Sequence, residues 1–143
     1  MRAALALLLA SACAAAAAEF KTVADNAAVL YDAPSRAAKP LYVVSKHYPL
    51  ELIVNLDAWV KVRDHTGALT WVERKSLGDR RMVMVTAAAA EARQRAEDGA
   101  PPAFGAAQGV VLDLLEIVPG GWLQVRHADG ATGYLRASLV WGL

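Results

Sequence analysis

The residues that could perform chemistry are few and scattered along this chain. A nucleophilic hydrolase needs a serine, threonine or cysteine next to a base. The only cysteine, Cys13, lies near the start of the chain, and no serine lies in the G-x-S-x-G pattern that exposes a nucleophile. The serines beyond Cys13 are Ser35, Ser45, Ser76 and Ser138. We therefore expect no catalytic nucleophile.

The histidines and carboxylates form no metal-binding or acid–base motif in the sequence. No two histidines have the H-x-x-x-H spacing that binds zinc. We interpret Glu91, Glu97 and Asp98 as a solvated acidic cluster, because a glycosidase needs two carboxylates held across a cleft. We expect no metal and no cofactor. The three histidines are interpreted as surface residues beside turns, with convergence in space as the alternative: His47, His65 and His127.

The charge balance and the cysteine content exclude several classes of protein. The chain has 15 Lys+Arg and 14 Asp+Glu, so its formal net charge is +1. A protein that binds nucleic acid through phosphates has a basic patch, and the pairs Arg80-Arg81 and Arg93-x-Arg95 are too short to form one. A single cysteine excludes an internal disulfide framework. We expect neither enzyme activity nor nucleic-acid binding.

Tryptophans with charged neighbours are better candidates for a binding surface. Trp59 shares a predicted strand face with Lys61 and Arg63, and Trp122 shares one with Arg126. Such a ring can stack on a sugar or a peptide while an arginine holds a carboxylate. The alternative is that each tryptophan packs against an aromatic residue of the next strand and only fills space. The sequence leaves both interpretations open.

The first half of the chain is the better candidate binder. Tyr31, Tyr42 and Tyr48 can extend its surface, whereas Phe104 is the only upstream aromatic counterpart in the second half. Tyr48 comes just before a predicted strand, where a loop at the rim of a barrel should lie. The candidate ligand-binding residues are Tyr48, Trp59, Arg63, Trp71, Trp122, Arg126 and Tyr134.

The chain contains an internal repeat. Trp59–Arg63 recurs 63 residues later as Trp122–Arg126, and Leu50–Ile53 recurs 62 residues later as Leu112–Leu115. The spacing changes at the turn Pro119–Gly121, where a length change is tolerated. We infer a duplication of a unit of about 60 residues. Because a unit of that size buries too little surface to be stable alone, we expect the two units to pack on each other.

Short strands dominate each unit. Polar and apolar side chains alternate in Trp59–Arg63, the turn Asp64–Gly67 follows, and a strand then returns. Alternating Met and Val in Arg81–Thr86 indicate the strand that closes unit one. The strand that closes unit two, near Val140 and Trp141, must be very short. Several short strands at close spacing favour an all-β fold of two tandem small antiparallel barrels.

One stretch has two interpretations. Ala87–Asp98 is rich in Ala, Glu, Arg and Gln, which favour a helix. The register of the repeat instead aligns Ala90–Arg95 with Ala28–Ala33, which should be the first strand of a unit. We favour a strand and keep a helical turn between the two units as the alternative.

The first 18 residues have the pattern of a cleaved signal peptide. Arg2 supplies a positive charge, a short apolar run follows, and Ala16–Ala18 provides the small residues that signal peptidase needs before Glu19. An uncleaved anchor is less favoured because a bilayer requires about 20 apolar residues. Lipidation of Cys13 is a further alternative. We expect a periplasmic mature chain with no membrane span, divided into domains at residues 19–86 and 87–143.

A known family pattern runs through the first unit. Its parts are the stretch Val29–Ser35 with its Pro-Ser end, the W-x-K-V of Trp59–Val62, the turn residue Gly67 and the pair Trp71-Val72. This order resembles the bacterial SH3-like domain over Val23–Thr86 and, more weakly at its start, over Ala90–Leu143. The resemblance implies two tandem SH3-like barrels in an exported bacterial protein that binds cell-wall peptides or partner proteins.

Two functions follow from these observations. The first is a non-catalytic periplasmic module that recognises a peptide, such as a cell-wall peptide, or a partner protein. The second is a structural or regulatory subunit of an envelope complex that binds no small ligand. Exposed, clustered aromatic residues favour the first, and packed aromatic residues with a flat apolar patch favour the second.

Overall fold

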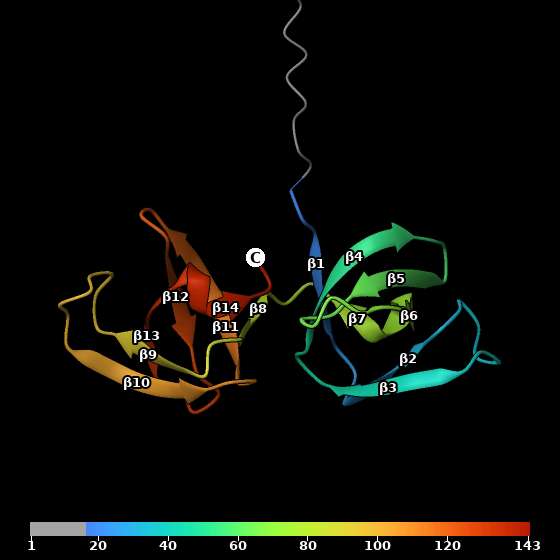
Figure 1. Cartoon of the computed structure of the whole chain (residues 1–143), viewed down its shortest axis with the longest axis horizontal. Helices are drawn as coiled ribbons and strands as arrows, with labels where there is room; N and C mark the ends of the chain where they lie inside the picture. Colours follow the sequence, from blue (N-terminus) through green and yellow to red (C-terminus); the bar gives the residue numbers. More distant parts are fainter. Residues whose placement is uncertain (1–16) are drawn as a thin grey trace, which may run out of the picture.

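Two antiparallel β-sheets make up the part of the chain that the structure, a computed structural model, describes, residues 17–143 (Figure 1). Unit one consists of β1 (Phe20–Val23), β2 (Ala27–Tyr31), β3 (Pro40–Ser45), β4 (Pro49–Asn55), β5 (Trp59–Arg63), β6 (Leu69–Glu73), the 3-10 helix η1 (Arg74–Ser76) and β7 (Leu77–Gly78). Unit two consists of β8 (Met82–Val85), β9 (Ala89–Arg93), β10 (Pro102–Ala107), β11 (Val111–Val118), β12 (Trp122–Arg126), β13 (Thr132–Arg136), η2 (Ala137–Leu139) and β14 (Val140–Trp141). The predicted signal peptide and Cys13 lie outside the described residues, except for Ala17 and Ala18.

The two sheets have the same topology. The strand order is β3-β2-β6-β5-β4-β1-β7 in unit one and β10-β9-β13-β12-β11-β8-β14 in unit two, so each strand of unit one has a counterpart in unit two. This correspondence confirms the predicted duplication and the all-β fold of two small antiparallel units. It also confirms that the strand that closes unit two, β14, is very short.

The prediction that Arg81–Thr86 closes unit one is wrong. The strand in this stretch, β8, pairs with β11 and β14 of unit two, and unit one is closed by β7 on β1. The reason is that β8 is buried on both faces. Val83 and Val85 enter the core of unit two, while Met82 and Met84 are buried outside that core and line pockets shared with unit one. A strand that is apolar on both faces does not show in its sequence which sheet it joins.

The stretch Ala87–Asp98, for which we favoured a strand over a helical turn, contains a strand. Residues Ala89–Arg93 make β9, the counterpart of β2, at the spacing that the repeat predicts. Ala90 and Ala92 alternate into the core and are 4% and 0% exposed. Burial of these two small side chains between the sheet faces outweighs the helical propensity of the segment.

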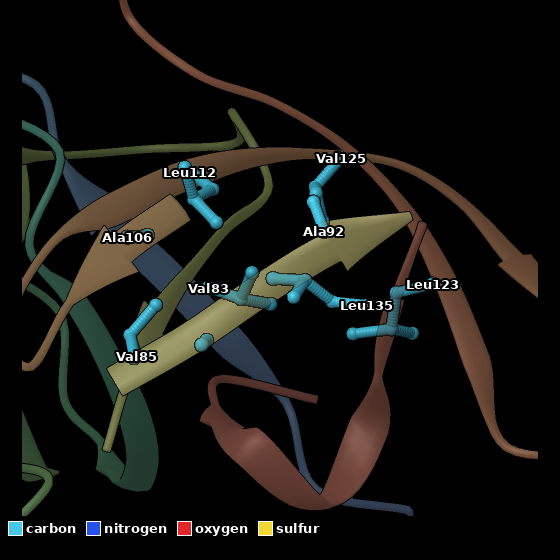
Figure 2. Close-up of a cluster of buried hydrophobic side chains, with 9 residues drawn as sticks. Val83, Val85, Ala92, Ala106, Leu112, Leu123, Val125 and Leu135 are labelled. Atoms are coloured by element: carbon cyan, nitrogen blue, oxygen red, sulfur yellow. The ribbon is translucent and has the colours of Figure 1, made fainter. Parts of the chain in front are cut away.

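The two cores are filled in complementary ways. Leu30 of β2 corresponds to Ala92 of β9, and both are fully buried. On the next two strands of the sheet the sizes are reversed, because Val72 and Val60 of unit one correspond to Leu135 and Leu123 of unit two. Figure 2 shows Ala92, Leu123 and Leu135 together in the core of unit two. The two longer leucines thus offset most of the side-chain volume that the change from leucine to alanine removes.

The two units pack on each other. They lie side by side as two lobes, with β1, β8 and the C-terminus between them (Figure 1). Phe20 of β1 makes an edge-to-face contact with Trp141 of β14, with ring centroids 5.0 Å apart. The segment that joins the units is held to unit two, because Arg81 donates a hydrogen bond to the carbonyl of Gly142 and Arg80 pairs with Asp113 of β11. Within residues 17–143, no helix is long and apolar enough to cross a bilayer.

Candidate functional site

Unit one carries a cluster of aromatic side chains on the outer face of its central strands. Trp59 lies on β5, Trp71 on β6 and Tyr31 on β2, and all three side chains are half-buried. Tyr31 and Trp59 meet edge to face, with centroids 5.5 Å apart. Trp71 is opposite Tyr31 on one side and Lys61 on the other, and the Lys61 ammonium lies 6.0 Å from its ring. We call these four residues the aromatic face.

Strand alternation produces this face. Val60 and Val62 are 1% and 0% exposed in the core, so the side chains between and around them point outward. The predicted orientation of Trp59, Lys61 and Arg63 is therefore confirmed by the burial pattern of β5. Tyr31 reaches the same surface from the end of β2, which the sequence suggested only as an extension of the unit-one surface.

The structure does not bring Tyr48 and Arg63 to Trp59. Arg63 is at the other end of β5, four residues or roughly 13 Å along the strand, and it forms an ion pair with Glu51 at 2.9 Å. Tyr48 packs against the core at that same end and hydrogen-bonds to His65 Nδ1 at 2.5 Å. Burial raises the pKa of Tyr48 to about 12. These two residues are thus separated from the aromatic face.

Unit two covers the tryptophan that corresponds to Trp59. Trp122 is 6% exposed, and the Arg136 guanidinium lies 4.2 Å from the centre of its ring. Tyr134 is half-buried on β13 opposite Gln124. Trp122 is therefore largely buried, but the side chain that covers it is an arginine and not the aromatic residue of the next strand that the space-filling interpretation expected.

One pair of charges, reversed between the units, explains the difference. In unit one Arg36, in the loop after β2, forms two hydrogen bonds of 2.8 and 3.2 Å to Glu73, and these hydrogen bonds lower the pKa of the Glu73 carboxyl. At the same place in unit two, Asp98 accepts two hydrogen bonds of 3.2 and 2.7 Å from Arg136. The strand residue is opposite the tryptophan in both units. In unit two it is the arginine, and its guanidinium stacks on the indole.

Two of the histidines converge with charged residues between the units. His47, in the turn before β4, and His127, after β12, line one pocket together with Arg80, Asp113 and Arg126. The sequence favoured isolated surface histidines, because the convergence depends on how the two units pack. Among residues 17–143, no three or more His, Cys, Asp or Glu residues are grouped so that they could hold a metal ion.

Comparison with known proteins places the chain in a family. Residues 24–79 and 86–142 each match the family model of the bacterial SH3 domain. The chain belongs to the bacterial SH3 domain family. Its two copies correspond to the two sheets, and bacterial SH3 domains are generally non-catalytic binding modules.

Solved structures that are similar to this tandem SH3 protein include NlpC/P60 proteins. NlpC2 from Trichomonas vaginalis is 12% identical with a TM-score of 0.40, and the match covers 87% of this chain and 48% of that one. An NlpC/P60 family protein from Bacillus cereus ATCC 10987 is 15% identical with a TM-score of 0.39, over 86% of this chain and 56% of that one. The chain thus spans about half the length of these structures. No curated protein matches its sequence.

Proposed function

We propose that this chain is a non-catalytic periplasmic binding module that recognises a peptide through the aromatic face of unit one. A cell-wall peptide is the ligand class that we favour, in keeping with the bacterial SH3 family. One observation carries the proposal. Unit one leaves Trp59 half-buried beside Tyr31 and Trp71, whereas unit two covers the corresponding Trp122 with an arginine.

The chemistry of the face suits a peptide. The rings of Tyr31, Trp59 and Trp71 offer apolar contact area with little side-chain freedom to lose on binding. Lys61 places an ammonium group beside Trp71, where it can hold a peptide carboxylate or carbonyl. The pair Arg36–Glu73 closes one end of the surface and stays charge-neutral, so it does not compete for an anionic group.

The periplasmic location rests on the signal-peptide pattern in residues 1–18. We expect the exported protein to begin at Glu19, and the intact mass of protein isolated from the periplasm measures this directly. A mass increased by a diacylglycerol group on Cys13 would instead show a lipoprotein, and an unprocessed mass would contradict cleavage.

A second candidate function is supported by the edge of the same unit. β3 is the last strand of its sheet, and its Leu41, Tyr42 and Val43 side chains are 39%, 53% and 69% exposed. An open strand edge with apolar side chains can pair with a strand of another protein. This observation favours the alternative of an interaction subunit in an envelope complex.

A binding comparison of two variants tests the proposed function. We expect Trp59→Ala to weaken binding to purified cell wall about tenfold, because a central aromatic anchor typically contributes more than 1 kcal/mol. Tyr42→Ala on the β3 edge should bind cell wall like the unaltered protein. Sedimentation with purified cell wall measures both, and circular dichroism checks that each variant is folded. Unchanged binding by a folded Trp59→Ala protein would exclude the aromatic face. If Tyr42→Ala fails to capture envelope proteins while Trp59→Ala still captures them, the second function is favoured.

A further inference from the structure

A pocket of about 270 Å³ lies between the two units, on the side of unit two that faces unit one. The residues that line this pocket come from different segments of the chain. His47 belongs to unit one and Arg80 to the segment that joins the units, while Asp113, Arg126 and His127 come from unit two. The pocket therefore exists only when the two units are packed together. We call it the seam pocket.

Positive charge exceeds negative charge in the wall of the seam pocket. Asp113 is 9% exposed and accepts hydrogen bonds of 2.7 and 2.8 Å from Arg80, which lowers the pKa of its carboxyl. The Arg126 Nε atom is 3.6 Å from the second carboxylate oxygen, beyond hydrogen-bond distance. Two guanidinium groups thus share one carboxylate. Within residues 17–143, the Arg126 side chain donates no hydrogen bond, so its guanidinium N–H groups are available to an anion.

The two histidines add hydrogen-bonding groups beside these arginines. His127 Nδ1 lies 3.2 Å from both the backbone nitrogen and the carboxylate of Asp129. Nε2 carries a proton and can donate in the protonated ring and in the neutral ring whose Nδ1 accepts the Asp129 N–H. His47 has a φ of 73°, a conformation that is unfavourable for a residue with a Cβ. Its backbone N–H is held by the Val23 carbonyl at 2.9 Å. Burial, Arg80 and Lys46 lower the pKa of His47, as expected in a positive field.

A second, more apolar pocket of about 310 Å³ adjoins the first. The two pockets share Val111, and Met84 and Tyr48 are in the wall of the second. Val111 and Asp113 point the same way from β11, because Leu112 between them is fully buried in the core of unit two. An apolar surface thus leads directly to the cationic groups around Asp113.

We infer that the seam between the two units is a second binding site, which takes the C-terminal end of a short peptide. The free carboxylate binds Arg126 and the Nε2–H of His127, and the last apolar side chain lies against Val111 and Met84. The inference goes beyond the proposed function, because the site includes none of the residues of the aromatic face. A carboxylate and an inorganic phosphate share the chemistry that two guanidinium groups recognise, so the test must separate them.

Titrations of the full mature protein followed by NMR test this inference. The probes are N-acetyl-alanyl-leucine with a free carboxylate, the same dipeptide with a C-terminal amide, and inorganic phosphate. We expect the free acid to shift the backbone amides of Val111 and His127, and to bind at least about tenfold more tightly than the amide, because a charged hydrogen bond is lost with the amide. Phosphate should bind more weakly than the free acid.

Two matched variants locate the site. Arg126→Gln should weaken binding of the free acid about tenfold. Arg95→Gln, which removes the same charge from an exposed position in unit two, should leave binding unchanged. Because the Arg126 and Arg95 side chains are 46% and 59% exposed, both variants should fold, and circular dichroism checks this. Equal binding of acid and amide, or unaltered binding by Arg126→Gln, would overturn the inference. Phosphate that binds as tightly as the dipeptide would overturn the assignment to a peptide end.

Discussion

Leu30→Ala is expected to lower the free energy of unfolding by about 2–5 kcal/mol, the range for removing a buried leucine side chain. Leu30 is fully buried in the core of unit one. Its neighbours there include Val60 and Val72, whose short side chains cannot extend into the space that the change leaves. Urea unfolding of the variant and of the unaltered protein measures the difference.

The second unit supplies the control for this prediction. It carries Ala92 where unit one has Leu30, together with the longer Leu135 and Leu123 on the next two strands of the sheet. The triple variant Leu30→Ala, Val60→Leu, Val72→Leu reproduces that arrangement in unit one. We expect it to be more stable than Leu30→Ala alone, because the added methylene groups refill the cavity. A triple variant no more stable than the single one would contradict the interpretation that the two longer leucines compensate for the smaller alanine in unit two.

Asp113→Ala is expected to lower the free energy of unfolding by about 2–3 kcal/mol, because it removes two charged hydrogen bonds. These bonds join Asp113 of β11 to Arg80 in the segment between the units. The matched control is Glu51→Ala, at the corresponding position of unit one. In the described part of the chain, Glu51 accepts only one hydrogen bond from Arg63 and has no second arginine beside it, so its loss should have a smaller effect of less than about 1 kcal/mol.

The stabilisation that the Asp113 carboxylate contributes should decrease at acidic pH. Arg80 lowers the pKa of Asp113 in the folded protein below its value in the unfolded chain. The stabilisation is therefore complete above the unfolded pKa, about 4, and is lost as the pH falls through the lowered folded pKa. Unfolding of both proteins in urea at pH 7 and pH 3 tests this. The stability difference between Asp113→Ala and the unaltered protein should narrow at pH 3, and a constant difference would contradict the role of the carboxylate.

Local patterns in the sequence were sufficient for much of the fold. Alternation alone placed Val60 and Val62 in the core and Trp59 outside it. The repeat register identified β9 against its helical composition. Alternation was insufficient for β8, because Met82 and Met84 are buried by the neighbouring unit, and that packing has no counterpart in the local sequence.

The candidate site was predictable only in part. Trp59 and Trp71 do lie on one face, since neighbouring strands place them there. Trp122 looked equivalent to Trp59 in the sequence, but its burial depends on Arg136, a residue on another strand. The pocket shared by His47 and His127 depends on the arrangement of the two units, which no local pattern records.

The reversed charge pair also bears on how a tandem repeat avoids exchanging strands between its copies. Two adjacent units with the same topology can misassemble by such an exchange during folding. If the loop of unit one docked on β13, Arg36 would meet Arg136, and if the loop of unit two docked on β6, Asp98 would meet Glu73. Both mispaired arrangements bring like charges together, whereas both native arrangements join opposite charges. The charge on each loop thus favours docking on the sheet of its own unit over docking on the sheet of the other unit.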